Sequence, residues 1–158
     1  MTGIAEIRDA IGESWIPQIY ADRVRPLRTR AFEMNIAERE SSPEIMDTLL
    51  GCELKAGRVR IPCPTRPVAR YLAIFARLGC RKVAVPYDIT QIPELADEFE
   101  SAWAVAERQL ALASAGLSPQ SAGRLRAALI REMRTEIAKI GSGELMPLFD
   151  TSTKQRKD

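Results

Sequence analysis

The sequence predicts an α+β fold that is predominantly α-helical, with a small strand-helix-strand unit followed by a long C-terminal helical hairpin. Residues 58–86 contain two short alternating segments on either side of a strongly two-faced helix, and residues 92–140 carry apolar side chains at helical spacing. With 158 residues, 46% of them hydrophobic and 28% charged, the chain has the length and balance of one ordinary domain. We therefore assign residues 1–150 to a single compact domain and residues 151–158, which have nothing to bury, to a disordered tail.

Helix starts along the chain are marked repeatedly by serine or threonine followed within three residues by proline. A first helix is expected over residues 4–11, and a second helix follows with Pro17 in its first turn. Pro26 is expected to kink or split that second helix, because proline lacks the N–H that an inner turn needs. Ser41, with a glutamate three residues later, has the spacing of a capping box and predicts a third helix over residues 43–50.

The strand-helix-strand unit is the most informative part of the chain. In residues 58–61, arginines alternate with apolar side chains as in a half-exposed strand. Thr65 then caps a helix over residues 66–78, and residues 82–86 form a second alternating strand. Two strands joined by a crossover helix normally pair in parallel, so we expect a right-handed parallel unit.

Two short strands do not make a stable sheet alone, so we expect a third strand from the same chain or from another copy of it. Leu54 is one candidate, in a hairpin that turns at Ala56 and Gly57. The alternative is a symmetry-related copy of the chain that extends the sheet.

The last third of the chain predicts an antiparallel pair of long helices. Residues 92–114 place apolar side chains in a seven-residue rhythm, and Gly116 ends this helix. A second long helix covers residues 119–140. Arg126 lies on its apolar arc and needs a partner, which we expect to be a carboxylate of the acidic first helix or a group on another chain. The alternative is that Arg126 reaches solvent from the first turn.

The composition excludes several common chemistries. Histidine is absent, which removes histidine-dependent triads, bases and metal ligands, and there is no glycine-rich phosphate loop. The three cysteines, Cys52, Cys63 and Cys80, are an odd number in a chain that can fold by burial, so we expect inert thiols in a reducing compartment. No apolar run approaches the ~20 residues of a membrane span. We expect a cytoplasmic protein with no membrane association, no metal and no cofactor.

The charges are sorted along the chain, although the formal net charge is only +2. Residues 53–82 hold eight basic residues and one acidic residue, whereas residues 88–107 hold six acidic residues and no basic one. One interpretation of the arginines is a solvated face that the acidic helix neutralises in part. The other is a ridge that contacts an anion. The candidate anion-binding residues are Arg58, Arg60, Arg66, Arg70 and Arg77.

A second candidate site depends on the parallel pairing of the two strands. Ligands of open sheets bind beyond the carboxyl ends of parallel strands, and an anion would suit the helix N-terminus there. The edge residues are Cys63, Thr65 and Arg66 after the first strand and Tyr87 and Asp88 after the second. The competing interpretation is that Thr65 is only a helix cap. The spacing of Cys63 fits neither a phosphatase loop nor a dithiol motif, which favours an inert thiol.

Binding is therefore a better prediction than catalysis. The sequence predicts a non-enzymatic, self-associating regulatory or adaptor module whose arginine-rich surface contacts an anionic partner, either a nucleic acid or an acidic protein patch. One alternative is a small enzyme or anionic-ligand sensor that uses the strand-end edge. Another is a structural subunit of a larger assembly. We assign no catalytic and no metal-ligating residue.

Overall fold

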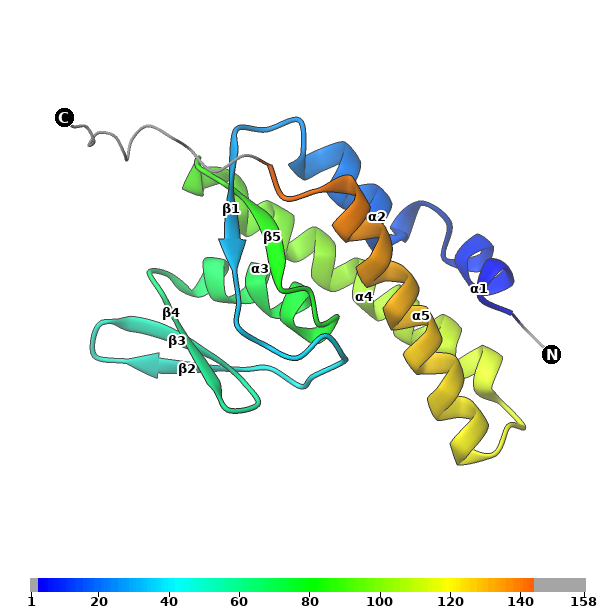
Figure 1. Ribbon diagram of the computed structural model, residues 1–158. Helices are drawn as coiled ribbons and strands as arrows, with labels where there is room; N and C mark the ends of the chain where they lie inside the picture. The colour runs from blue at the N-terminus through cyan, green and yellow to red at the C-terminus, as the bar shows by residue number, and fades with distance from the viewer. Residues whose placement is uncertain (1–2, 144–158) are drawn as a thin grey trace.

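One central helix, α3 (Arg66–Arg77), packs against a three-stranded antiparallel sheet and against the long helix α4 (Ile92–Ser114) (Figure 1). The computed structural model describes residues 3–143. It is 57% helical, with a few antiparallel strands and a long C-terminal helix pair, which confirms the predicted mainly helical α+β class. The other elements are α1 (Ile4–Ile11), α2 (Ile16–Ile19), α5 (Pro119–Ile140), β1 (Thr29–Glu33), β2 (Glu44–Thr48), β3 (Gly51–Ala56), β4 (Val59–Cys63) and β5 (Lys82–Pro86).

The N-terminal segment follows the prediction through its first two helices. Helix α1 spans the predicted residues, and α2 begins with Pro17 in its first turn and continues as a π-helical turn, η2 (Tyr20–Val24). Pro26 lies beyond the end of this helix and does not kink it. The chain then forms β1, which was not predicted because its sequence, Thr-Arg-Ala-Phe-Glu, shows no regular apolar alternation.

The predicted third helix over residues 43–50 is wrong, because Glu44–Thr48 form strand β2. Ser41 does not cap a helix. Its hydroxyl donates to the carbonyl of Ala76 at 2.8 Å, and its backbone N–H donates to the carbonyl of Arg77 at 3.1 Å. The serine thus fastens this segment to the C-terminal end of α3, and the residues that follow pair with β3.

The two strands that flank α3 do not pair with each other, so the predicted parallel unit is wrong. Strand β4 pairs antiparallel with β3, and β5 pairs antiparallel with β1 in a separate two-stranded sheet. The predicted hairpin that contains Leu54 is confirmed, although its two turn residues are Gly57 and Arg58. Each flanking strand finds an antiparallel partner elsewhere, which removes the reason for a crossover pairing.

The core between β5, α3 and α4 is built around two buried tyrosines. The hydroxyl of Tyr20 accepts from the N–H of Ala84 at 2.8 Å, and the hydroxyl of Tyr71 donates to the carbonyl of Ala84 at 2.7 Å. These two bonds satisfy both backbone polar groups of Ala84. The tyrosine rings also contact Phe75 and Phe99 in tilted or edge-on arrangements.

The predicted C-terminal helical hairpin is confirmed, and α4 and α5 lie antiparallel in Figure 1. The Ser118 hydroxyl accepts from the N–H of Ser121 at 3.1 Å and caps the start of α5, and Gly141, with φ 95°, follows its end. The predicted tail, residues 151–158, lies outside the described residues. Within residues 3–143 no helix combines the length and the hydropathy that crossing a membrane requires.

Candidate interaction surface at the β2–β3 hairpin

The residues of the predicted ligand edge belong to two different sheets. Cys63 ends β4, whereas Tyr87 and Asp88 follow β5. The Thr65 hydroxyl accepts from a backbone N–H in the first turn of α3 at 3.4 Å. The Asp88 carboxylate accepts from the N–H of Thr90 at 3.0 Å, at the start of a short 3-10 turn. Both polar groups therefore have local structural partners, and the parallel geometry that would bring the two groups of residues together is not formed.

The cysteines are free and buried. The Cys63 thiol donates to the carbonyl of Ile61 at 3.5 Å, and burial together with the neighbouring Cys52 raises its pKa. Burial also raises the pKa of Cys80 to about 12. A thiol with a raised pKa stays protonated at neutral pH and is a poor nucleophile. Cys63 therefore serves to pack the sheet and not as a nucleophile.

The central arginine of the predicted stripe is bound within the chain. Arg70 of α3 forms ion pairs with Asp97 and Glu100 of α4, and its Nη2 lies 2.7 Å from Oε1 of Glu100. Hydrogen bonds to Glu100 and Asp97 raise the pKa of Arg70. The acidic start of α4 thus neutralises part of the basic face of α3.

The rest of the stripe is partly engaged as well. The contacts of these arginines are Arg60 with Glu53 at 2.9 Å, Arg66 with Asp47 at 3.1 Å, and Arg77 over the ring of Trp103 at 5.6 Å from its centroid. Arg58 is exposed on the turn between β3 and β4. Three of the five candidate arginines thus already have a carboxylate partner in the same chain.

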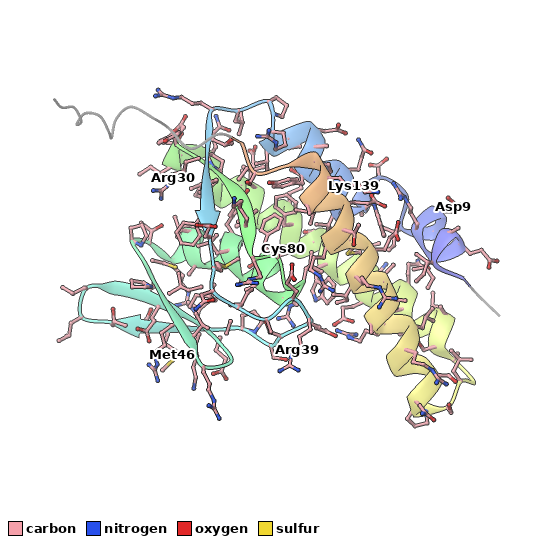
Figure 2. The ribbon with its side chains drawn as sticks, in the orientation of Figure 1. Asp9, Arg30, Arg39, Met46, Cys80 and Lys139 are labelled. Atoms are coloured by element: carbon pink, nitrogen blue, oxygen red, sulfur yellow. The ribbon has the colours of Figure 1, made fainter. Side chains whose placement is uncertain are left out.

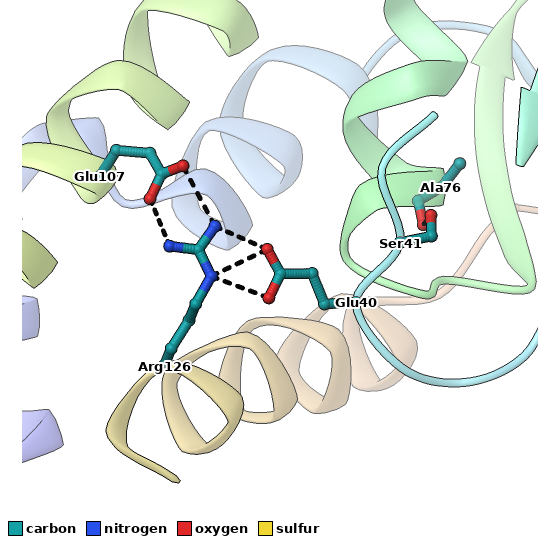
Figure 3. Close-up of polar contacts among 5 residues, drawn as sticks. All are labelled: Glu40, Ser41, Ala76, Glu107 and Arg126. Atoms are coloured by element: carbon teal, nitrogen blue, oxygen red, sulfur yellow. Dashed lines mark hydrogen bonds and ion pairs between the residues drawn. The ribbon is translucent and has the colours of Figure 1, made fainter. Parts of the chain in front are cut away.

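Arg126 of α5 joins three segments of the fold (Figure 3). Its guanidinium donates to the carboxylate of Glu40 at 2.6–2.9 Å and to that of Glu107 at 2.6–3.1 Å. The carboxylate expected from the acidic helix is therefore present as Glu107 on α4. Because Glu40 lies just before β2, this cluster fixes the entry to β2 against the helical hairpin.

The tip of the β2–β3 hairpin carries two leucines that no other part of residues 3–143 covers. Leu49 and Leu50 form the loop between the strands, and their relative exposures are 104% and 96%. Met46 on β2 is also exposed, at 42%, and Figure 2 places it at the periphery of the molecule. Burying one leucine side chain is worth about 1.5–3 kcal/mol, so an exposed pair is a strong candidate for a binding contact.

The geometry of the turn does not require leucine. Two-residue hairpin loops favour asparagine, aspartate and glycine, which tolerate positive φ. Neither Leu49 nor Leu50 has a positive φ, and the φ of 135° falls on Gly51 instead. A Cβ on Gly51 would lie 3.1 Å from the carbonyl oxygen of Cys63, so the positive φ and this close approach together favour glycine there. The leucines serve neither the turn nor the core.

Two hollows flank β2. The tip groove, of about 580 Å³, is lined by Thr48, Leu49, Leu50, Cys52, Glu53, Pro62 and Cys63. The arginine groove, of about 380 Å³, lies at the other end of the strand between β2, α3 and α4, and is lined by Pro43, Ile45, Arg66, Arg70, Ala73, Ile74, Arg77, Glu100 and Trp103. Three of the predicted stripe arginines therefore meet in one groove, beside apolar side chains of β2 and α4.

The hairpin tip was missed in the sequence because residues 43–50 were assigned to a helix. The available signal was a pair of leucines directly before Gly51, which fits a helix end as well as a turn. Among residues 3–143, no group of three or more cysteine, histidine or carboxylate side chains is arranged to hold a metal ion. Comparisons of the chain with protein-family models, curated proteins and solved structures gave no match.

Proposed function

We propose that this protein is a non-enzymatic adaptor or regulatory module that binds another protein through the β2–β3 hairpin tip. The observation that carries the proposal is the full exposure of Leu49 and Leu50 on a turn whose geometry does not need them. Apolar side chains that are held out on a short, hydrogen-bonded hairpin are pre-organised for contact, because little conformational freedom is lost when they are buried.

A protein partner suits this surface better than a nucleic acid. Nucleic-acid binding relies on basic groups that are free to neutralise phosphates, whereas Arg60, Arg66 and Arg70 already pair with carboxylates of the chain. Protein interfaces combine apolar anchors with arginines, and the arginine groove lies at the end of β2 opposite the tip. We therefore assign the anchor of the contact to the tip leucines. The arginine groove belongs to its polar rim, where an acidic patch of a partner must compete with the chain's own carboxylates.

The proposed location of the module is the cytoplasm. Cys52, Cys63 and Cys80 are free and buried, which suits a reducing compartment.

The proposal is tested by photo-crosslinking from the tip. A photoreactive amino acid is placed at Leu49 in the full chain, and the products formed in the expressing cell are identified by mass spectrometry. The matched control is the same substitution at Leu112, an exposed leucine of α4 with a relative exposure of 65%. We expect discrete protein adducts from position 49 that co-expressed unsubstituted chain competes away, and weak, diffuse labelling from position 112. Equal labelling from the two positions would overturn the proposed function.

A further inference from the structure

We infer that the protein bound by this surface is a second copy of the same chain, joined through antiparallel pairing of β2 with β2 of the second copy about a two-fold axis at Met46. This inference rests on the proposed function and names its partner. The resulting dimer would have a continuous six-stranded sheet, because each copy contributes the three strands β2, β3 and β4.

The two outer strands of this sheet differ in their ability to accept another strand. Strand β4 contains Pro62, which has no N–H to donate, and Pro64 follows directly after the strand. Proline on an edge strand is a common protection against edge-to-edge pairing. Strand β2 contains neither proline nor lysine within Glu44–Thr48, and most of its side chains are exposed; its neighbouring proline, Pro43, lies before the strand and leaves all five of its N–H groups in place. The β2 edge is therefore open to pairing, and the β4 edge is not.

Pairing about Met46 gives a compatible register. The opposite residues are then Met46 with Met46, Ile45 with Asp47, and Glu44 with Thr48 of the second copy. Like charges do not face each other in this register, and the two methionines form an apolar contact on the axis. Met46 also lies opposite Glu53 of β3, and the Glu53 carboxylate already pairs with Arg60 at 2.9 Å.

The same pairing brings the hairpin tip of each copy to the arginine groove of the other. Residue 49 of one copy falls opposite Pro43 of the second copy, and Pro43 and Ile45 line that groove together with Trp103. Asp47 of one copy falls opposite Ile45 of the other, and Ile45 lines the same groove as the stripe arginines. The apolar tip thus meets an apolar wall. The Asp47 carboxylate of each copy, which pairs with Arg66 of its own chain at 3.1 Å, lies beside a residue that lines the other copy's groove.

This arrangement argues for a second copy rather than an unrelated protein. A two-fold contact uses one surface on both partners, so that surface must carry both a ridge and the groove that receives it. The hairpin tip with its two leucines, which serves as the ridge, lies at one end of β2, and the arginine groove lies at the other end. Because a five-residue strand and two leucines form a small interface, we expect a dimer with micromolar affinity that dissociates on dilution.

The first experiment measures the mass of the purified full-length chain by sedimentation velocity across a wide range of concentrations. We expect a monomer–dimer equilibrium. Leu49→Asp should weaken the dimer by about tenfold or more, because it places a charge where an apolar side chain is buried. Leu112→Asp, which changes an equally apolar exposed side chain on α4, should leave the equilibrium unchanged. Circular dichroism of both variants checks that the fold is retained.

The second experiment tests the register by cross-linking. Met46→Cys should form a disulfide-linked dimer under mild oxidation, because position 46 faces itself across the axis. Glu44→Cys and Thr48→Cys should link weakly alone but readily when the two variants are mixed. Leu112→Cys and the unsubstituted chain, whose own cysteines are buried, are the controls.

The outcomes separate this inference from the proposed function. A dimer that links through position 46 and through the mixed pair supports the inference. A chain that stays monomeric, or a dimer that persists while position 46 fails to link, overturns it. If the chain is monomeric and position 49 still forms competed adducts with a different protein, the proposed function stands and the second copy is excluded. If position 49 forms no specific adduct, both fail.

Discussion

At the scale of single residues, Gly79 shows how closely the segment before β2 packs on α3. Gly79 follows α3 with φ 78°, and a Cβ there would lie 2.5 Å from the backbone nitrogen and oxygen of Arg39. The position therefore combines a backbone conformation that favours glycine with a close approach of main chain. Arg39 and the neighbouring Ser41 belong to the segment that leads into β2, so Gly79 helps to place the hairpin.

We expect Gly79→Ala to lower the free energy of unfolding by about 3 kcal/mol or more. The left-handed conformation alone costs a non-glycine residue about 1–2 kcal/mol, and the contact with Arg39 adds a shift of backbone atoms. Gly116→Ala is the matched control, because Gly116 has φ 83° but nothing lies within 4 Å of the added Cβ. Gly116→Ala should lower the free energy of unfolding only by the cost of the left-handed conformation, about 1–2 kcal/mol. Urea unfolding followed by circular dichroism measures both, and equal losses would show that the contact with Arg39 is not tight.

Tyr20 links the core to the C-terminal end of α5. Its hydroxyl accepts from the N–H of Ala84 and donates to the carbonyl of Gly141 at 2.6 Å. Burial raises the pKa of Tyr20 from 10.0 to about 12. Because the pKa in the folded state lies above the value in the unfolded state, the neutral phenol stabilises the fold fully below pH 10. This contribution is lost as the pH rises from 10 to about 12.

We expect Tyr20→Phe to lower the free energy of unfolding by about 1–3 kcal/mol at pH 7, because the buried N–H of Ala84 loses its acceptor. Above pH 10 the variant should lose stability less steeply than the native chain, by up to about 1.4 kcal/mol per pH unit. Burial also raises the pKa of Tyr71, so some alkaline sensitivity remains in the variant. Tyr87→Phe, at a partly exposed tyrosine, is the control. Urea titrations at a series of pH values test this, and parallel pH profiles for the native chain and Tyr20→Phe would contradict it.

At the scale of elements, the helices could be predicted because their signals are local. Thr65 and Ser118 cap helices a few residues away, and apolar spacing of three and four marks the buried faces of α3, α4 and α5. Those residues act within one or two turns, so a single sequence contains the whole signal. The predicted bounds of α1, α4 and α5 match the structure for the same reason.

The strands were harder because their partners are distant in the sequence. Strand β1 pairs with β5, and Ser41, which has the spacing of a cap, bonds to carbonyls at the far end of α3. A capping signal and a tertiary anchor use the same residue, and only the folded chain distinguishes them. The candidate site could therefore be predicted only in part. Three arginines of the predicted stripe do meet in one groove, but the two leucines of the tip fall in a segment that the sequence predicts as a helix.

At the scale of the whole molecule, the separation of charge along the sequence is largely cancelled in space. The basic helix α3 lies beside the acidic first half of α4, and Arg70 bridges the two through Asp97 and Glu100 (Figure 1). An arginine that is already paired must break its ion pair before it can bind a phosphate. The charge pattern therefore serves the assembly of the fold first, and an external polyanion would have to compete with the chain's own carboxylates.

This cancellation predicts the response of the protein to nucleic acid. We expect a labelled oligonucleotide to bind weakly in fluorescence anisotropy even at low salt, and the combined change of Arg66, Arg70 and Arg77 to alanine to alter that binding little. The same change should instead lower the free energy of unfolding by about 1 kcal/mol, the usual scale of exposed ion pairs. Arg58→Ala, at an exposed arginine of the β3–β4 turn, is the matched control and should leave stability unchanged.

Tight binding would contradict this expectation if its affinity falls steeply with salt and is lost in the arginine variant. For duplex DNA, each phosphate neutralised contributes a slope of about −0.9 in the logarithm of affinity against the logarithm of salt concentration. A steep slope would mean that phosphates displace Asp47, Asp97 and Glu100 from their arginines, and the partner would then be a nucleic acid. A flat slope would mean that these ion pairs hold, and the arginines of α3 would then serve the assembly of the fold rather than the binding of nucleic acid.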